Sequence, residues 1–149
     1  MSRAERLAYL RTALAAALPS RNVTRSFVMH TMLPDADLAP GRITVISAGV
    51  ADYPYETSDY NGSPTGPRQT EDATLQLIIT GQIKLPEGTD PAAVEDAESD
   101  LLADLEVFAD AAIADPEMVA LRILRARQSQ QLDAPYGWIH TEWVWPVLE

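Results

Sequence analysis

His140 and Glu142 are the residues whose types and spacing most resemble a catalytic or metal-binding pair. Residues two apart on a strand point to the same face, so the imidazole and the carboxylate would lie side by side. The other histidine, His30, could approach them from a different predicted strand. Zinc sites normally have three or four ligands, and this pair supplies two. The pattern therefore favours a polar strand face, with a small hydrolase using a His140–Glu142 dyad as the alternative.

No larger catalytic motif accompanies the pair. The chain has no cysteine, so it cannot complete the zinc site of a nucleobase deaminase or form a disulfide. It also has no His-Glu-x-x-His, no Gly-x-Ser-x-Gly and no glycine pattern that cradles phosphates. We therefore expect no catalytic residues, no cofactor and no metal. A chain of 149 residues without cysteine fits one domain, 1–149, in a reducing cytoplasm.

Charge is unevenly distributed along the chain. The net charge of −11 disfavours wrapping nucleic acid or docking on an anionic membrane. Residues 87–117 hold many acids and no Lys or Arg, whereas the first 42 residues are rich in arginine, including Arg25 and Arg42. A solvated helix face explains such a run most simply. The alternative is head-to-tail self-association, in which the acidic face of one copy meets the basic face of the next.

Local patterns predict the elements of the first half. Ser2 and Glu5 fit a capping box, and the leucines that follow at steps of three and four predict a helix that ends at Pro19. Strands are predicted for 23–32, 43–50 and 75–84, with a loop at 33–41. The segment 53–72 reads as a long loop. Its tyrosines Tyr53, Tyr55 and Tyr60, with Arg68, are candidates for contacts with partners, although the tyrosines could equally pin the loop to its own domain.

The second half begins with a helix signal. Asp90 is a predicted N-cap and Pro91 a first helical residue, and an apolar stripe predicts an acidic amphipathic helix to about 115. Residues 119–127 could form a helix or a strand, and their short length and the breakers around them favour a strand. A polar loop at 128–137 follows, and 139–145 reads as the last strand. The order α-β-β-β-α-β-β predicts an α+β domain, with both main helices on one face of a mostly antiparallel sheet. Trp143 and Trp145 lie opposite His140 on the last strand, where they either pack on a helix or face a neighbour.

The chain resembles the tail terminator proteins of long-tailed bacteriophages, the family of the lambda-type minor tail protein U. The stretches that carry the resemblance are 43-ITVISAGVADYP-54, 76-QLIITGQIKLPEGTDPAAVEDAE-98 and 134-APYGWIHTEWVW-145. The likeness is closest to terminator-type proteins of transposable phages with siphovirus tails.

The resemblance implies a structural protein rather than an enzyme. Such proteins form a hexameric ring on the last ring of the tail tube, stop its polymerisation and offer a surface for head joining. The implied partners are other copies of the chain, the major tail tube protein and head–tail connector proteins, with DNA only passing through the channel and no membrane. The implied location is the virion tail, and the host cytoplasm during assembly. The alternative within the same assembly is a head–tail joining or head-completion protein.

Overall fold

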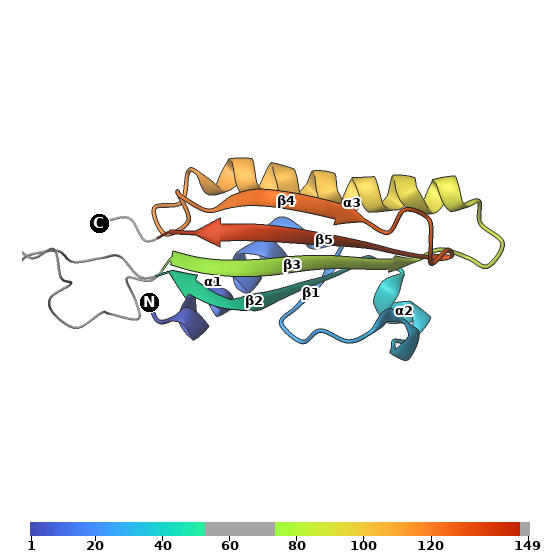
Figure 1. Cartoon of the computed structure of the whole chain (residues 1–149), viewed down its shortest axis with the longest axis horizontal. Coiled ribbons are helices and arrows are strands. Elements are labelled where there is room, and N and C mark those ends of the chain that lie inside the picture. Colours follow the sequence, from blue (N-terminus) through green and yellow to red (C-terminus); the bar gives the residue numbers. More distant parts are fainter. Residues whose placement is uncertain (53–73, 147–149) are drawn as a thin grey trace, which may run out of the picture.

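The computed structural model describes residues 1–52 and 74–146, with the side chains of residues 51 and 52 excepted. The fold is α+β, with a five-stranded, mostly antiparallel sheet and two main helices, and the predicted order of main helices and strands is confirmed (Figure 1). The tyrosine-bearing loop predicted for 53–72 lies outside the described residues. No helix among the described residues has the length and apolar character needed to cross a membrane.

Helix α1 (Arg3–Ala17) begins with the predicted capping box, because Ser2 accepts from the Glu5 amide and Glu5 accepts from the Ser2 amide. The strand predicted for 23–32 is wrong over most of its length. Only β1 (Asn22–Thr24) joins the sheet, and the chain then leaves it and forms the short helix η1 (His30–Met32). The predicted loop at 33–41 contains a further short helix, α2 (Asp35–Leu38). Strand β2 (Arg42–Asp52) contains the predicted 43–50.

The elements of the second half match their predictions more closely. Strand β3 spans Thr74–Lys84. Helix α3 (Pro91–Ala112) is capped by Asp90, whose carboxylate accepts from the Ala92 amide at 3.0 Å. Strand β4 (Arg122–Gln128) starts later than predicted, and β5 (Tyr136–Trp145) starts earlier. The local signals of capping, proline placement and alternation therefore located these elements well.

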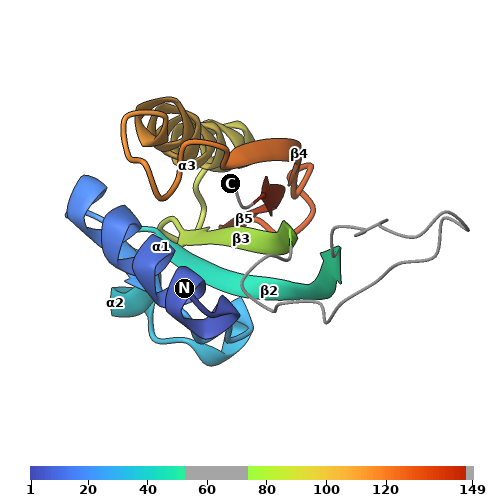
Figure 2. The same cartoon turned by 90° about the vertical axis from the view of Figure 1, so that its left-hand side faces the viewer.

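The strands lie in the order β1-β2-β3-β5-β4, with β1 parallel to β2 and every other pair antiparallel. Helix α1 packs on β1 and β2, and α3 packs on β3, β5 and β4. Both helices lie on the same side of the sheet (Figure 2). We call the opposite side, which Figure 1 views directly, the open face.

The hydrophobic core fills the space between the helices and the sheet. It includes the following side chains, each exposing at most 1% of its surface: Leu10, Leu14, Ile43, Val45, Leu77, Ile79, Leu101, Leu105 and Ile139. A polar residue, Thr141, is also fully buried on this side. Its hydroxyl donates to the Ile79 carbonyl and accepts from the Trp143 indole N–H, both at 2.6 Å, so the buried group is satisfied.

Candidate functional site

The open face carries rows of polar side chains that the strand register places side by side. Arg42 pairs with Gln82 and Gln82 with Trp138, while Thr44 pairs with Thr80, which is opposite His140. His140 in turn faces Arg127 of β4. Directly opposite residues have Cβ atoms about 4.5–5.5 Å apart, so each row forms a continuous strip across the sheet.

The segment 25–29 crosses the end of these rows, and we call it the strap. The Arg42 guanidinium donates to the Ser26 carbonyl at 2.7 Å, and the Gln82 amide N–H donates to the Val28 carbonyl at 2.9 Å. These two side chains hold the strap by its backbone. They therefore explain why the predicted strand at 23–32 breaks off, since its carbonyls bond to side chains instead of a neighbouring strand.

Several buried polar atoms beneath the strap have no hydrogen-bond partner among the described residues. They are Arg42 Nε, Thr44 Oγ1, Thr80 Oγ1 and Gln82 Oε1. Gln82 exposes 2% of its surface and Thr80 7%. Leaving one buried donor or acceptor unsatisfied costs about 1–3 kcal/mol, so such atoms are rare and normally have a reason. Their concentration in adjacent rows marks this part of the open face as a candidate site.

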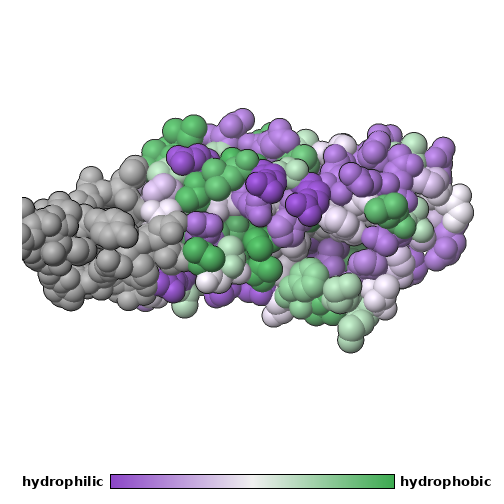
Figure 3. Space-filling view, viewed as in Figure 1, coloured by the Kyte–Doolittle hydropathy of each residue, from purple (hydrophilic) through white to green (hydrophobic). Residues whose placement is uncertain are grey.

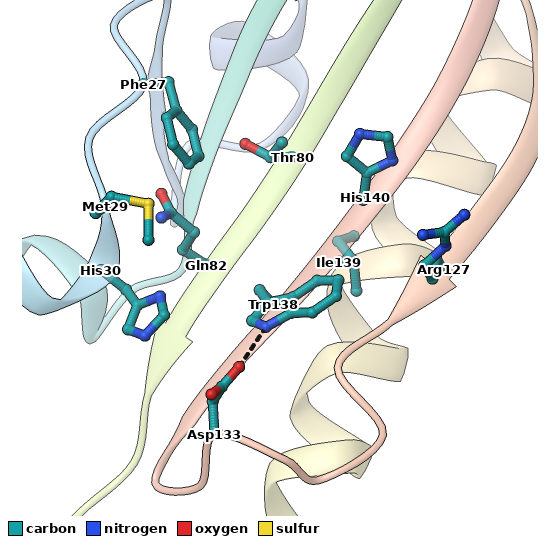
Figure 4. A pocket seen from close by; sticks show the side chains of 10 residues that line it. All are labelled: Phe27, Met29, His30, Thr80, Gln82, Arg127, Asp133, Trp138, Ile139 and His140. Atoms are coloured by element: carbon teal, nitrogen blue, oxygen red, sulfur yellow. Dashed lines mark hydrogen bonds between the residues drawn. The ribbon is translucent and has the colours of Figure 1, made fainter.

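A cavity of about 460 Å³ opens over two of these residues, Thr80 and Gln82. Thr80 and Gln82 lie between Phe27 and Met29 of the strap on one side and Trp138 and His140 of β5 on the other (Figure 4). The remaining lining residues are His30, Arg127, Asp133 and Ile139. The volume of this cavity lies in the range of about 300–1,000 Å³ that small-molecule sites occupy.

The two histidines of the chain both line this cavity, as the sequence allowed, but Glu142 does not. The Glu142 carboxylate instead lies 3.3 Å from the Arg125 guanidinium on β4. The described residues contain no group of three or more His, Asp or Glu side chains placed to hold a metal ion. The His30 ring packs on Tyr136 with centroids 4.6 Å apart.

The outer face of α3 is acidic and points away from the sheet. Its exposed acids are Glu95, Asp96, Asp100, Glu106 and Asp110. Two apolar side chains are exposed beside them, Val107 at 68% and Ile113 at 63%. Most of the predicted acidic surface is therefore present, but it includes apolar groups that a purely solvated face would not need.

The predicted basic surface at the start of the chain is partly used inside the molecule. Arg6 and Arg42 are buried, and the Arg21 guanidinium pairs with Asp104 of α3 at 3.0 Å. Arg25 is exposed. The interaction role predicted for Arg42 needs correction, because its side chain exposes 9% of its surface and holds the strap.

The exposed arginines gather on β4, the edge strand farthest from β1. Arg122, Arg125 and Arg127 are all exposed there, next to Leu124 at 57%. The strand register places the three arginines opposite Val144, Glu142 and His140, which lie on the open face. An edge strand with unpaired backbone groups is a natural place for contact with another chain, and charged side chains limit nonspecific pairing there.

Trp143 and Trp145 expose 1% and 2% of their surfaces. The sequence allowed these tryptophans either to pack on a helix or to face a neighbour. They pack beneath the helices, so they cannot serve as surface contacts. The Trp145 indole donates to the Glu117 carbonyl at 2.9 Å, and the Arg6 guanidinium lies 4.7 Å from its ring centroid. The candidates Tyr53, Tyr55, Tyr60 and Arg68 lie outside the described residues.

Other large apolar side chains are exposed along the strap and its continuation. Phe27 exposes 45% of its surface, Met29 51% and Met32 76%. Leu132, in the turn between β4 and β5, exposes 77%. Figure 3 shows the open face as hydrophobic areas interspersed with hydrophilic ones. Exposed apolar groups rimmed by polar residues are typical of surfaces that bind a partner or ligand.

The chain matches no protein-family model, and no curated protein matches it at a significant level. The site therefore has to be interpreted from its own geometry.

Sequence reasoning missed the polar floor formed by Thr80 and Gln82, because alternation on a strand predicts only that such residues face away from the core. It also missed Glu98, because this residue lies in a run of acids that is most simply interpreted as a solvated helix face. Glu98 is fully buried, and its Oε2 accepts from the Trp138 backbone N–H at 2.7 Å and from the Ser129 hydroxyl. One signal was available, since Glu98 continues the apolar stripe of α3 one turn after Val94.

Proposed function

We propose that this chain is a structural protein that assembles head to tail into a ring, and that the ring caps a phage tail tube as a tail terminator. In this role its partners are other copies of the chain, the major tail tube protein and the head–tail connector. The α+β fold with two helices on one face of a sheet agrees with what the resemblance to tail terminators implies.

The observation that carries the proposal is the placement of opposite charge on opposite sides of the molecule. The acids of α3, with Val107 and Ile113 among them, face away from the sheet on the helix side. The arginines of β4, with Leu124 among them, border the open face. Each surface combines charge of one sign with exposed apolar groups, so the two are complementary.

Contact between unlike surfaces of identical copies is heterologous, and it closes into a ring when the rotation between copies is right. Complementary charge favours the correct register and speeds encounter, while the exposed apolar side chains supply area to bury. A pair of unlike surfaces on opposite sides therefore suits a ring better than a twofold dimer, which uses the same surface twice.

The assembly step is tested by charge reversal on the two surfaces separately. One variant carries Asp96→Lys, Asp100→Lys and Asp110→Lys, and the other carries Arg122→Glu and Arg127→Glu. Each alone should fail to form rings in the presence of purified tail tubes, as seen by electron microscopy and light scattering. An equimolar mixture should recover rings of alternating copies, because each repulsive contact becomes attractive again.

The control variant is Arg11→Glu, an exposed charge change on α1 outside both surfaces, which should assemble normally. If each reversed variant forms rings on its own, the assigned surfaces are wrong. The tail role has a separate test in a phage that lacks this gene. The tails of this phage should be abnormally long. In the phage that carries the gene, the protein should copurify with free tails before heads join. Tails of normal length in the phage that lacks the gene would contradict the terminator function.

A further inference from the structure

The floor of the open-face cavity presents two side-chain oxygens that the chain itself leaves without partners. Thr80 Oγ1 and Gln82 Oε1 are both buried and unpaired, although the Gln82 amide nitrogen donates to the Val28 carbonyl. Both oxygens point toward the side of the cavity where Phe27 lies (Figure 4). The glutamine oxygen can only accept, and the threonine hydroxyl can donate or accept. A group that satisfies this floor must bring at least one N–H or O–H donor.

The walls of the cavity favour a flat ring. Phe27 and Met29 form one wall, and both are about half exposed, at 45% and 51%. The Trp138 indole forms the facing wall (Figure 4). Its orientation is fixed, because its indole N–H donates to the Asp133 carboxylate at 2.8 Å and its backbone N–H donates to Glu98. Aromatic and thioether groups make favourable contacts with planar rings.

The two ends of the cavity differ in charge. Arg127 and His140 lie at one end and Asp133 at the other (Figure 4). Arg127 forms no ion pair with the other described residues. Its guanidinium is a planar fork that matches the oxygens of a phosphate or carboxylate. A ligand with an anionic group would therefore lie with that group toward Arg127.

We propose that this cavity binds a small anionic ligand with a planar, N–H-bearing ring, the chemistry of a nucleoside monophosphate. The base lies between Phe27 and Trp138 and donates to the Gln82 oxygen. Thr80 provides the second hydrogen bond, and the phosphate contacts Arg127. This binding does not rest on ring assembly, since the cavity lies within one copy of the chain.

The binding test uses the full chain and the four ribonucleoside 5′-monophosphates, measured by isothermal titration calorimetry. At least one should bind saturably with one site per chain. Its parent nucleoside, which lacks the phosphate, and ribose 5-phosphate, which lacks the base, should each bind at least about tenfold more weakly. Binding should also shift the NMR signal of the Trp138 indole N–H, which can be assigned with a Trp138→Phe variant.

Matched variants distinguish binding in the cavity from binding to the surrounding surface. Arg127→Leu should weaken the nucleotide by about tenfold or more and leave the nucleoside unaffected, because it removes a charge-assisted contact to the phosphate alone. Arg122→Leu changes another exposed arginine of the same strand, outside the cavity, and should have no effect on binding. Thr80→Val should weaken both nucleotide and nucleoside, whereas Thr44→Val, in the same row but not lining the cavity, should weaken neither.

Three results would overturn the proposal. The first is that none of the four monophosphates binds at millimolar concentration. The second is that ribose 5-phosphate binds as tightly as the nucleotide. The third is that the Arg127→Leu and Arg122→Leu variants lose the same amount of nucleotide affinity. Thermal unfolding checks that each variant is folded. Arg127 is exposed, so its variant remains informative even where Thr80→Val fails to fold. Ring assembly is scored in buffer without nucleotide, so failure of one proposal leaves the other measurable.

Discussion

The Glu98 carboxylate accepts a hydrogen bond from the backbone N–H of Trp138 at 2.7 Å. This contact joins the middle of α3 to the start of β5 across the helix-side packing layer. The same oxygen accepts from the Ser129 hydroxyl, so it also fixes the chain between β4 and β5. Because Trp138 forms a wall of the open-face cavity, a buried acid on one side of the sheet positions a candidate binding residue on the other.

Replacing Glu98 tests this link. Glu98→Leu removes the acceptor and leaves the Trp138 N–H and Ser129 O–H without partners. Each of the two lost buried partners costs about 1–3 kcal/mol, so the free energy of unfolding should fall by about 2–6 kcal/mol. Glu98→Gln retains an acceptor oxygen and should cost less. The matched control is Glu95→Gln, an exposed acid on the same helix, which should change stability by no more than about 0.5 kcal/mol. Urea denaturation measures all three, and equal stability of the Leu and Gln variants would refute the link.

Close packing around the same contact makes Gly137 a sensitive position. A Cβ atom at Gly137 would come within 2.9 Å of Glu98 Cγ and Val94 Cγ1. Gly137→Ala should therefore lower the free energy of unfolding by about 1–3 kcal/mol through overpacking. Combining it with Val94→Ala should cost less than the sum of the two single changes, because the smaller side chain makes room. Strict additivity in urea denaturation would show that the close approach is not the cause.

The parts of the fold that sequence predicted well are those set by local chemistry. The Ser2–Glu5 capping box and the Asp90–Pro91 start both lie where expected, since each needs only residues within one turn. Alternation also located β3 and β5, because their core-facing residues are apolar along most of their length.

The parts that sequence could not predict depend on distant residues. The stretch 23–32 has strand propensity, yet Arg42 and Gln82 bind its carbonyls and hold it over the open face, where it is not a strand of the sheet. Charge alone likewise suggested that Arg42 and Glu98 were solvated, although partners far along the chain bury both. The cavity arises from the register of β3 against β5 combined with the strap, and neither is encoded in a local motif.

Arg6 provides the next prediction, because it connects α1 to the end of β5. It exposes 3% of its surface, donates to the Trp145 carbonyl and lies 4.7 Å from the Trp145 ring centroid. Burial lowers the pKa of its guanidinium, which still stays charged in the neutral range. Arg6→Met keeps much of the packing but removes both contacts, so stability should fall by about 1–3 kcal/mol. Arg11→Met, an exposed arginine of the same helix, is the control and should have little effect. Equal melting curves for the two variants would argue against a structural role for Arg6.

Lys84 permits a clean pH measurement because it is the only lysine of the sequence. Its ammonium group donates to the Asp35 carboxylate at 2.9 Å, and this hydrogen bond raises the pKa of Lys84 above its ordinary value of 10.5, although burial opposes the shift. The protonated lysine is thus favoured in the folded state. The stability that the pair contributes is present below the unfolded pKa and is lost as the pH rises through the folded pKa.

The Lys84 pKa can be followed as one NMR signal in protein labelled with ¹³C-lysine. Asp35→Asn should lower the midpoint toward the ordinary value, since it removes both the charge and the strongest hydrogen bond. Glu87→Gln is the matched control, because that carboxylate lies 3.7 Å from the ammonium and acts only through its charge, so the midpoint should move less. The stability difference between wild type and Asp35→Asn should shrink above the folded pKa, where the lysine is neutral in both proteins. An unchanged midpoint in Asp35→Asn would show that the ion pair does not form in solution.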